Sequence, residues 1–221
     1  MKKYNKTTRK PYVFITLFLL LNIFAGKTMA IEEPKFTLLK KSEAFELRKY
    51  EPKIIAEVEI DGNIKQASNN GFRLIADYIF GNNTAPSGNT EKISMTAPVT
   101  MESQARSEKI SMTAPVTMEK QKSENTEKWL MHFVMPSQYS IETLPKPNNP
   151  DVKVRQIPEM NYAVIRFSGF TGSEKVQEKT NLLLDWMKQN DLTPKGQPEL
   201  ARYNSPIALP FLRRNEVMIS Y

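Results

Sequence analysis

The segment Glu91–Glu102 reads EKISMTAPVTME, and the same twelve residues recur without change at Glu108–Glu119. In each copy apolar residues alternate with polar ones, so that Ile93, Met95 and the apolar residues after them fall on one side. This period of two predicts a β-strand with one face available to a core. Only Ser103–Ser107 separate the copies, which favours an antiparallel hairpin between them. The proline in each copy removes a backbone donor and predicts an edge-like or bulged strand.

Two helices and several strands are expected around the repeat. Apolar residues at three- and four-residue steps over Asp61–Phe80 predict an amphipathic helix that ends at Gly81–Asn83. A capping box at Thr171 and Glu174 predicts a second helix that runs to about Asn190. Strands are expected at Phe36–Leu39, Ala44–Tyr50, Ile54–Ile60, Lys128–Pro136, Val152–Ile157, Tyr162–Ser168, Ala201–Tyr203 and Val217–Tyr221. The order strand–strand–helix–strand–strand occurs twice, which indicates an α+β fold with an antiparallel sheet or barrel rather than a parallel doubly wound sheet.

The first thirty residues have the pattern of a secretory signal. A basic stretch, Met1–Lys10, precedes the apolar run Val13–Phe24, and Thr28 and Ala30 suit a cleavage site. Twelve apolar residues are fewer than the roughly 20 that a membrane-spanning helix needs. We therefore expect a signal peptide at 1–30 and one exported domain at 31–221, periplasmic or secreted. An uncleaved membrane anchor is the alternative.

Composition excludes several classes of site. The 221 residues include no cysteine, which excludes disulfides, cysteine-ligated metals and thiol nucleophiles. His132 is the single histidine, so no site can use two imidazoles. The formal charge is +7, but residues 1–30 hold six basic and no acidic residues, which leaves +1 for residues 31–221. A nearly neutral domain argues against a nucleic-acid partner.

Neither catalysis nor copper binding has a clear signal. The chain has no glycine-rich phosphate loop and no G-x-S-x-G motif, so we expect a protein that is not an enzyme. The methionine-rich repeat suggests copper(I), because thioether sulfur is a soft ligand. Met95 and Met101, however, would stand about 20 Å apart along one strand. Core packing by methionine is the favoured interpretation.

Five groups of residues, in order along the chain, resemble the SOUL haem-binding family. The resemblance spans Phe45–Tyr221 and rests on FELRKYEP at Phe45–Pro52, GFRLIADYIFGNN at Gly71–Asn83, KISMTAPVT at Lys92–Thr100 with VMPS at Val134–Ser137, YNSP at Tyr203–Pro206, and RRNEV at Arg213–Val217. The family strand is present twice here, which leaves open which copy fills it.

The resemblance implies pseudo-duplicated ββαββ units that form a twisted eight-stranded antiparallel barrel-like sheet flanked by two helices. It also implies non-covalent binding of haem or a related tetrapyrrole, without catalysis, in an apolar groove between the first helix and a carboxy-terminal loop. The cofactor-binding residues implied are Asn69, Phe72, Arg73, Ala76, Pro206, Leu209 and Leu212. A non-haem small-ligand-sensing or protein-interaction module on the same fold is the alternative, and we expect a monomer in either case.

An axial ligand to haem iron is not evident. Where family members have a histidine proposed as ligand, this chain has Lys49, which could ligate iron only when deprotonated, so a solvated surface lysine is favoured. His132 in KWLMHFVMP is a weak axial-ligand candidate, and a histidine partnered by a neighbour is the alternative. Arg213 and Arg214 could bind haem propionates, or could form a turn held by its own side chains.

Overall fold

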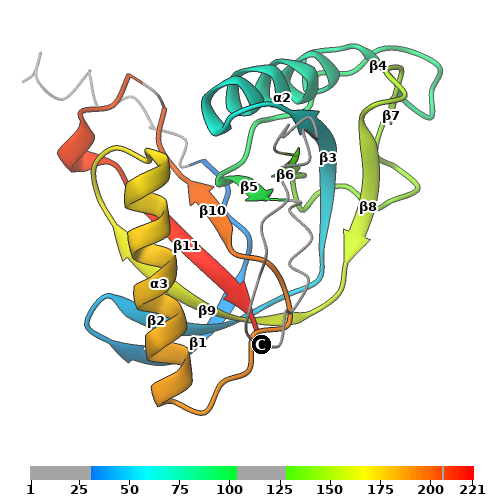
Figure 1. The fold of residues 1–221 in the computed structure, drawn as a ribbon. Coiled ribbons are helices and arrows are strands. Elements are labelled where there is room, and N and C mark those ends of the chain that lie inside the picture. The colour runs from blue at the N-terminus through cyan, green and yellow to red at the C-terminus, as the bar shows by residue number, and fades with distance from the viewer. Residues whose placement is uncertain (1–30, 104–127, 206) are drawn as a thin grey trace, which may run out of the picture. The chain divides into compact units, whose positions relative to one another are not determined.

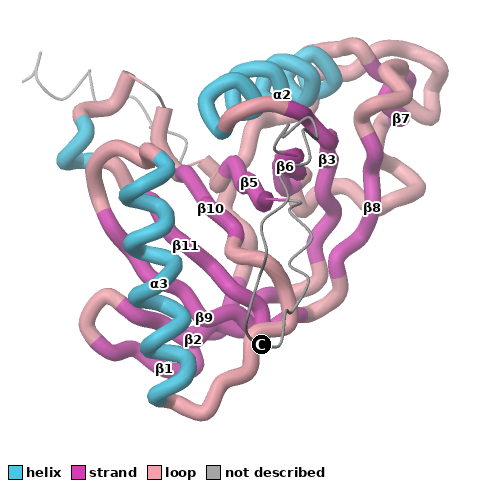
Figure 2. The backbone as a smooth tube through the Cα atoms, in the orientation of Figure 1, coloured by secondary structure: helices cyan, strands magenta, loops and turns pink. Residues whose placement is uncertain are grey.

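One antiparallel sheet dominates the computed structural model, which describes residues 31–103, 128–205 and 207–221. Within these residues the sheet has nine strands in the order β1-β2-β9-β11-β10-β5-β6-β3-β8. They are β1 Phe36–Ser42, β2 Phe45–Tyr50, β3 Lys53–Asp61, β5 Val99–Ser103, β6 Lys128–Val134, β8 Lys153–Ile157, β9 Met160–Phe167, β10 Glu199–Arg202 and β11 Asn215–Ser220; β4 Asn83–Thr84 and β7 Lys146–Pro147 pair separately. Figures 1 and 2 show the sheet curling. The α+β barrel-like prediction is confirmed, with one strand more than the eight implied.

Both predicted helices are present, α2 at Ile64–Ile79 and α3 at Ser173–Gln189. A reciprocal cap begins α2: the side-chain oxygen of Asn63 accepts from the backbone N–H groups of Lys65 and Gln66, and the Gln66 side chain accepts from the Asn63 N–H. Such a cap satisfies free amides of the first helical turn. The helix start is therefore specified by an asparagine three residues after the end of the predicted strand.

The capping box predicted for α3 is wrong. The helix begins at Ser173, with Gly172 at the N-cap, and makes no side-chain cap hydrogen bond. Thr171 therefore lies one residue too early to cap, and Glu174 falls in the first turn, where a negative charge is favourable to the helix dipole.

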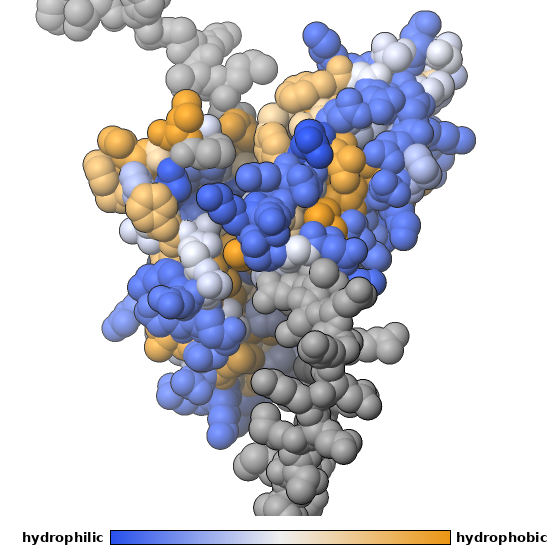
Figure 3. Space-filling model, turned by 45° about the horizontal axis from the view of Figure 1, so that its top comes forward, coloured by the Kyte–Doolittle hydropathy of each residue, from blue (hydrophilic) through white to orange (hydrophobic). Residues whose placement is uncertain are grey.

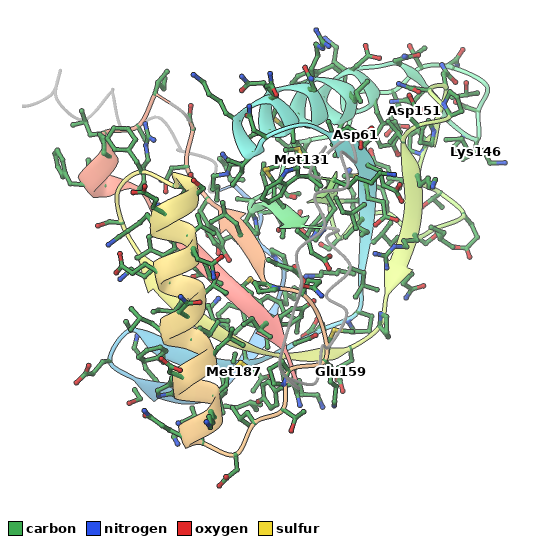
Figure 4. All side chains as sticks on the ribbon, viewed as in Figure 1. Asp61, Met131, Lys146, Asp151, Glu159 and Met187 are labelled. Atoms are coloured by element: carbon green, nitrogen blue, oxygen red, sulfur yellow. The ribbon has the colours of Figure 1, made fainter. Side chains whose placement is uncertain are left out.

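The pairing register gives the sheet two unlike faces. Residues opposite one another on neighbouring strands share a face, and Val217, Leu200, Met101, Met131 and Val58 form one continuous row. Both helices pack on the face of this row, α3 over β9 and β11 and α2 over β3 and β6, and we call it the helix face. Figure 4 labels two of the methionines that fill this layer, Met131 of β6 and Met187 of α3. The core of the domain lies here.

The opposite face carries buried polar and charged side chains instead. Arg48, Glu57, His132 and Glu216 are each less than 10% exposed. The guanidinium of Arg48 donates to both carboxylate oxygens of Glu216, at 2.7 and 2.9 Å, and to Glu46 at 2.7 Å. Buried charges are costly unless they are paired in this way.

The first repeat copy lies inside the sheet, because β5 has β6 on one side and β10 on the other. Met101 faces Met131 and Leu200 across the two ladders, so the hairpin predicted between the copies is wrong for this strand. The edge-strand prediction is wrong too. Because β5 begins at Val99, Pro98 lies just outside the ladder and its missing donor breaks no strand pairing. The second copy lies outside the described residues.

The predicted alternation of the repeat is realised only in part. Ile93 and Met101 are buried as expected, but Met95 is 38% exposed, and Thr96 and Thr100 are buried. Both faces of the segment therefore contact protein, and the Thr96 hydroxyl is satisfied by donating to the carbonyl of Val134. No helix in the described ranges is both long and apolar enough to cross a membrane. The signal segment at 1–30 lies outside those ranges.

Candidate functional site

The residues expected to bind a cofactor from the first helix lie along α2. Asn69 and Arg73 are exposed, and Phe72 is 38% exposed while its ring contacts Phe133 with centroids 5.5 Å apart. Ala76 differs, because it is only 8% exposed and packs in the core. The helix therefore offers one aromatic edge and two polar side chains to a ligand, with Ala76 behind them.

The two leucines expected from the carboxy-terminal loop lie around the short 3-10 helix η1, Pro210–Leu212, between β10 and β11. Leu209 is 55% exposed and Leu212 is 65% exposed. Pro206 lies outside the described residues. The loop thus presents large aliphatic side chains to solvent, which is unusual for a connection of this length.

Three further apolar side chains extend this surface, two from the loop that the family resemblance implied and one, Phe170, that no sequence signal had indicated. Ile207 is 92% exposed, and Phe211 and Phe170 are exposed nearby. The two loops are tied together, since the Gly169 N–H donates to the Pro210 carbonyl at 2.9 Å and the Arg213 guanidinium lies 5.3 Å from the Phe170 ring centroid. Figure 3 shows apolar side chains gathered at this end of the molecule. Exposed apolar patches are typical of surfaces that contact a ligand or partner, so this loop is a candidate for such a surface.

Arg202 links α2 to the strand that enters this loop. Its guanidinium donates to the Ser68 hydroxyl of α2 at 2.6 Å and contacts the Met101 sulfur at 2.7 Å. Arg202 takes part in none of the ion pairs formed among the described residues. Burial lowers the pKa of this guanidinium below its usual range, because water is removed and no nearby carboxylate compensates. A guanidinium in that state is suited to bind an anion.

His132 lies on the other side of the sheet from these residues. Phe133 faces Phe72 on the helix face, and His132, one position earlier, faces Thr100 and Glu57 on the opposite face. It is 4% exposed, and among the described residues its Nε2 has no hydrogen-bond partner. Burial, followed by the charges of Lys53 and Arg155, lowers the pKa of His132 to about 3. The structure does not bring it together with α2 and the loop.

The remaining basic residues singled out from the sequence have structural partners. Lys49 pairs with Glu159 at 2.7 Å and is about half exposed, as a surface lysine should be. Arg213 donates to the Ala208 carbonyl at 2.9 Å, and Arg214 pairs with Glu216 and Glu33. The described part of the chain contains no group of three histidine, aspartate or glutamate side chains placed to hold a metal.

A separate cavity of about 290 Å³ lies beside the turn between β2 and β3. Glu51, Lys53 and Gln156 line it together with Met135 and Tyr139. Its volume is at the lower end for small-molecule pockets, and its lining is polar as well as apolar. None of the residues expected to bind a cofactor contributes to it.

The similarity to known proteins agrees with this architecture. Residues 31–109 and 101–220 match the SOUL heme-binding protein family. The chain is 28% identical to human Heme-binding protein 2 over 178 residues, which cover 80% of this chain and 77% of that protein.

Two solved structures share the fold at low identity. The C-terminal domain of EcmrR has a TM-score of 0.55 and 10% identity, with 80% of this chain and 95% of that chain covered. A hydrolase from Listeria innocua has a TM-score of 0.51 and 9% identity, with 82% and 93% covered. Identities this low carry no information about activity. The family match, by contrast, extends over nearly all residues from Ile31 onward, and the chain belongs to the SOUL heme-binding protein family.

Proposed function

We propose that this domain binds haem or a related tetrapyrrole non-covalently, and catalyses no reaction, in an apolar groove between α2 and the η1 loop. Family membership and the printed name of the human relative support haem as the ligand. The observation that carries the proposal is Arg202, a guanidinium without a carboxylate partner among the described ion pairs, at the junction of α2 and the strand leading to the loop.

The chemistry of these residues suits a flat apolar molecule with acidic substituents. Phe72, Leu209 and Leu212 would contact the macrocycle, and Arg202 would bind a propionate through a charge-assisted hydrogen bond. Bound haem would supply its iron, and no described side chain of the groove is a histidine. Asn69 and Arg73 would border the groove on the solvent side.

We further propose that the domain works outside the cytoplasm, as a monomer. The basic, apolar and small-residue order of residues 1–30 supports export. The alternative function, sensing of a non-haem small ligand, is favoured by the 290 Å³ cavity near Lys53. A ligand held there would be insensitive to changes in the η1 loop.

Replacing Leu212 with aspartate is expected to raise the Kd for haemin at least tenfold. Burial of one leucine side chain contributes about 1.5–3 kcal/mol, and about 1.4 kcal/mol corresponds to a factor of ten. A titration of the mature domain followed at the Soret band measures the effect. The control is Leu182→Asp, which changes a leucine on α3 that is 42% exposed and should leave the Kd unchanged. Absence of a saturable Soret shift in the unmodified domain would refute haem binding.

Replacing Arg202 with glutamine should weaken haemin binding about tenfold while leaving the dimethyl ester of the same porphyrin unaffected. Glutamine keeps a donor for Ser68 but carries no charge, and a hydrogen bond to a charged group contributes about 1.5–3 kcal/mol. Parallel titrations with the acid and the ester at one ionic strength make the comparison. Equal weakening for both porphyrins would mean that Arg202 acts through packing and not through a propionate.

A further inference from the structure

We propose that the place of β5 in the sheet binds either copy of the repeated segment, so that Glu108–Glu119 exchanges with Glu91–Glu102 there. We call this place the β5 seat: the edges of β6 and β10 together with the residues of α2 and the following loop that contact the first copy. The inference is independent of haem binding. It concerns an interaction surface within the chain and commits to one occupant, the second copy.

The seat recognises the segment through its ladders first. β5 pairs with β6 from Val99↔Phe133 to Ser103↔Trp129, and with β10 from Val99↔Arg202 to Glu102↔Glu199. Met101 is 1% exposed between the two ladders. Four of the five strand residues, Val99–Glu102, belong to the repeated sequence.

The residues before the strand are held just as specifically. The Asn83 side chain donates to the Glu91 carbonyl at 2.7 Å and accepts from the Glu91 N–H at 3.0 Å. The Ile93 N–H donates to the Ile79 carbonyl at 2.8 Å, and the Thr96 hydroxyl donates to Val134. Glu91, Ile93 and Thr96 all lie inside the repeat, so these contacts use repeated residues only.

The second copy can therefore reproduce these contacts with the residues that stand 17 positions later. Met118 replaces Met101, and Glu108, Ile110 and Thr113 replace the three residues that contact the loop and helix. The change at the seat is confined to its end, where Lys120 takes the position of Ser103 opposite Trp129. Since the interactions are the same, the difference in free energy between the two arrangements is small and both are populated.

Chain connectivity is equally compatible with both arrangements. With the first copy in the seat, seven residues (84–90) join Asn83 to the copy and 24 residues (104–127) join Ser103 to Lys128. With the second copy the two loops exchange lengths, 24 residues (84–107) before the copy and seven (121–127) after it. Loop-closure entropy depends on loop length alone, to a first approximation, so the total cost is the same.

The family match is consistent with this symmetry. The matched range 31–109 contains the whole of the first copy, and the range 101–220 contains the whole of the second. Each of the two matched ranges therefore includes one complete copy of the repeat. Exchange moves a 17-residue stretch from the Ser103 end of the seat to the Asn83 end, next to the carboxyl end of α2.

An aspartate scan of the duplicated methionine tests the proposal. The variants are Met101→Asp, Met118→Asp and the double variant, and the readout is cooperative urea unfolding of the mature domain. A charge at this buried position blocks a copy from the seat. Each single variant should stay folded through the other copy. If the two arrangements are equally populated, losing one of them reduces the folded-to-unfolded ratio only about twofold. The double variant should lose cooperative unfolding.

Two controls keep the result decisive. Met131→Asp changes the cross-strand neighbour of Met101, labelled in Figure 4, which is 0% exposed and has no duplicate; it should lose cooperative unfolding. Deletion of residues 91–107 gives the same chain as deletion of 103–119, and this single-copy chain should fold with Lys120 and the seven-residue loop in place. If Met101→Asp unfolds the domain as fully as the double variant, or if the single-copy chain does not fold, the proposal is overturned.

Discussion

Replacing Arg48 with methionine is expected to lower the free energy of unfolding by about 3–5 kcal/mol, the usual cost of breaking a buried ion pair from one side. The Arg48 side chain is 2% exposed and Glu216 is fully buried, so water cannot replace the lost hydrogen bonds. Burial opposes ionisation of Glu216, but the hydrogen bond and charge of Arg48 outweigh it and hold the pKa of this carboxyl below its usual range. Urea unfolding at pH 7 measures the loss.

The double variant Arg48→Met/Glu216→Leu is expected to recover most of this stability. It removes both buried charges together, and a buried pair replaced by apolar groups of similar volume is often neutral or stabilising. The two charged groups left behind keep other partners, because Glu46 lies 3.2 Å from Lys41 and Arg214 lies 2.9 Å from Glu33. The hydroxyls of Tyr50 and Tyr203 each lose one hydrogen bond, which is why the recovery is not complete. A double variant as unstable as the sum of its single variants would show that the two residues act independently.

A surface lysine makes a matched control for the single variant. Lys49 is the residue after Arg48 and pairs with Glu159 at 2.7 Å, but about half of its side chain is exposed. Exposed ion pairs contribute about 0–1 kcal/mol, so Lys49→Met should change the free energy of unfolding by no more than about 1 kcal/mol. A large loss in Lys49→Met would mean that the β2 strand is sensitive to any substitution.

The helices were predictable because each is amphipathic on its own. The apolar stripe of α2 from Ile64 to Ile79 depends on residues three and four apart, which the sequence displays directly. The start of a helix depends on which side chain bonds the free backbone amides, and moving the start by one residue makes a different residue the N-cap. Thr171 was expected to cap α3, but the chain turns into the helix at Ser173.

Strand neighbours could not be predicted in the same way. The spacing of the two copies favours a hairpin, but β5 pairs instead with β10, whose residues lie about a hundred positions away. Such a choice depends on burial in the whole sheet. Met101 lies between Met131 on one neighbouring strand and Leu200 on the other, so it has an apolar neighbour on each side. Local spacing contains no information about those neighbours.

The charged groups of the candidate site show the same limit. Arg202 follows two apolar residues, Leu200 and Ala201, in a short strand, which is the one hint that it is not an ordinary surface arginine. Its partner Ser68 is 134 residues away, as Glu216 is 168 residues from Arg48. By contrast, the family resemblance pointed to Phe72 and Leu212, and the structure places both side chains at the surface.

Between pH 7.5 and pH 4.5, the His132→Gln variant is expected to lose about 2–3 kcal/mol less free energy of unfolding than the unmodified domain. The pKa of His132 is about 3 in the fold, against an ordinary value of 6.5, chiefly because burial disfavours the imidazolium and also because Lys53 and Arg155 are positive. Between these pH values the unfolded chain binds a proton that the folded chain does not. The stability due to His132 is therefore complete above pH 6.5 and is lost as the pH falls toward 3.

The magnitude follows from the pH interval. From 6.5 to 4.5 the difference grows by about 1.4 kcal/mol for each pH unit. Urea unfolding of both proteins at pH 7.5 and 4.5 isolates this contribution, because other groups titrate equally in the two. Glu216 and Glu46 have pKa values below the usual range, so their contribution to the free energy of unfolding falls in acid. Burial raises the pKa of Glu102 to about 7, so its contribution changes with pH in the opposite direction. If the variant and the unmodified domain lose the same stability in acid, His132 is protonated in the fold, and burial on the face opposite α2 does not keep it neutral.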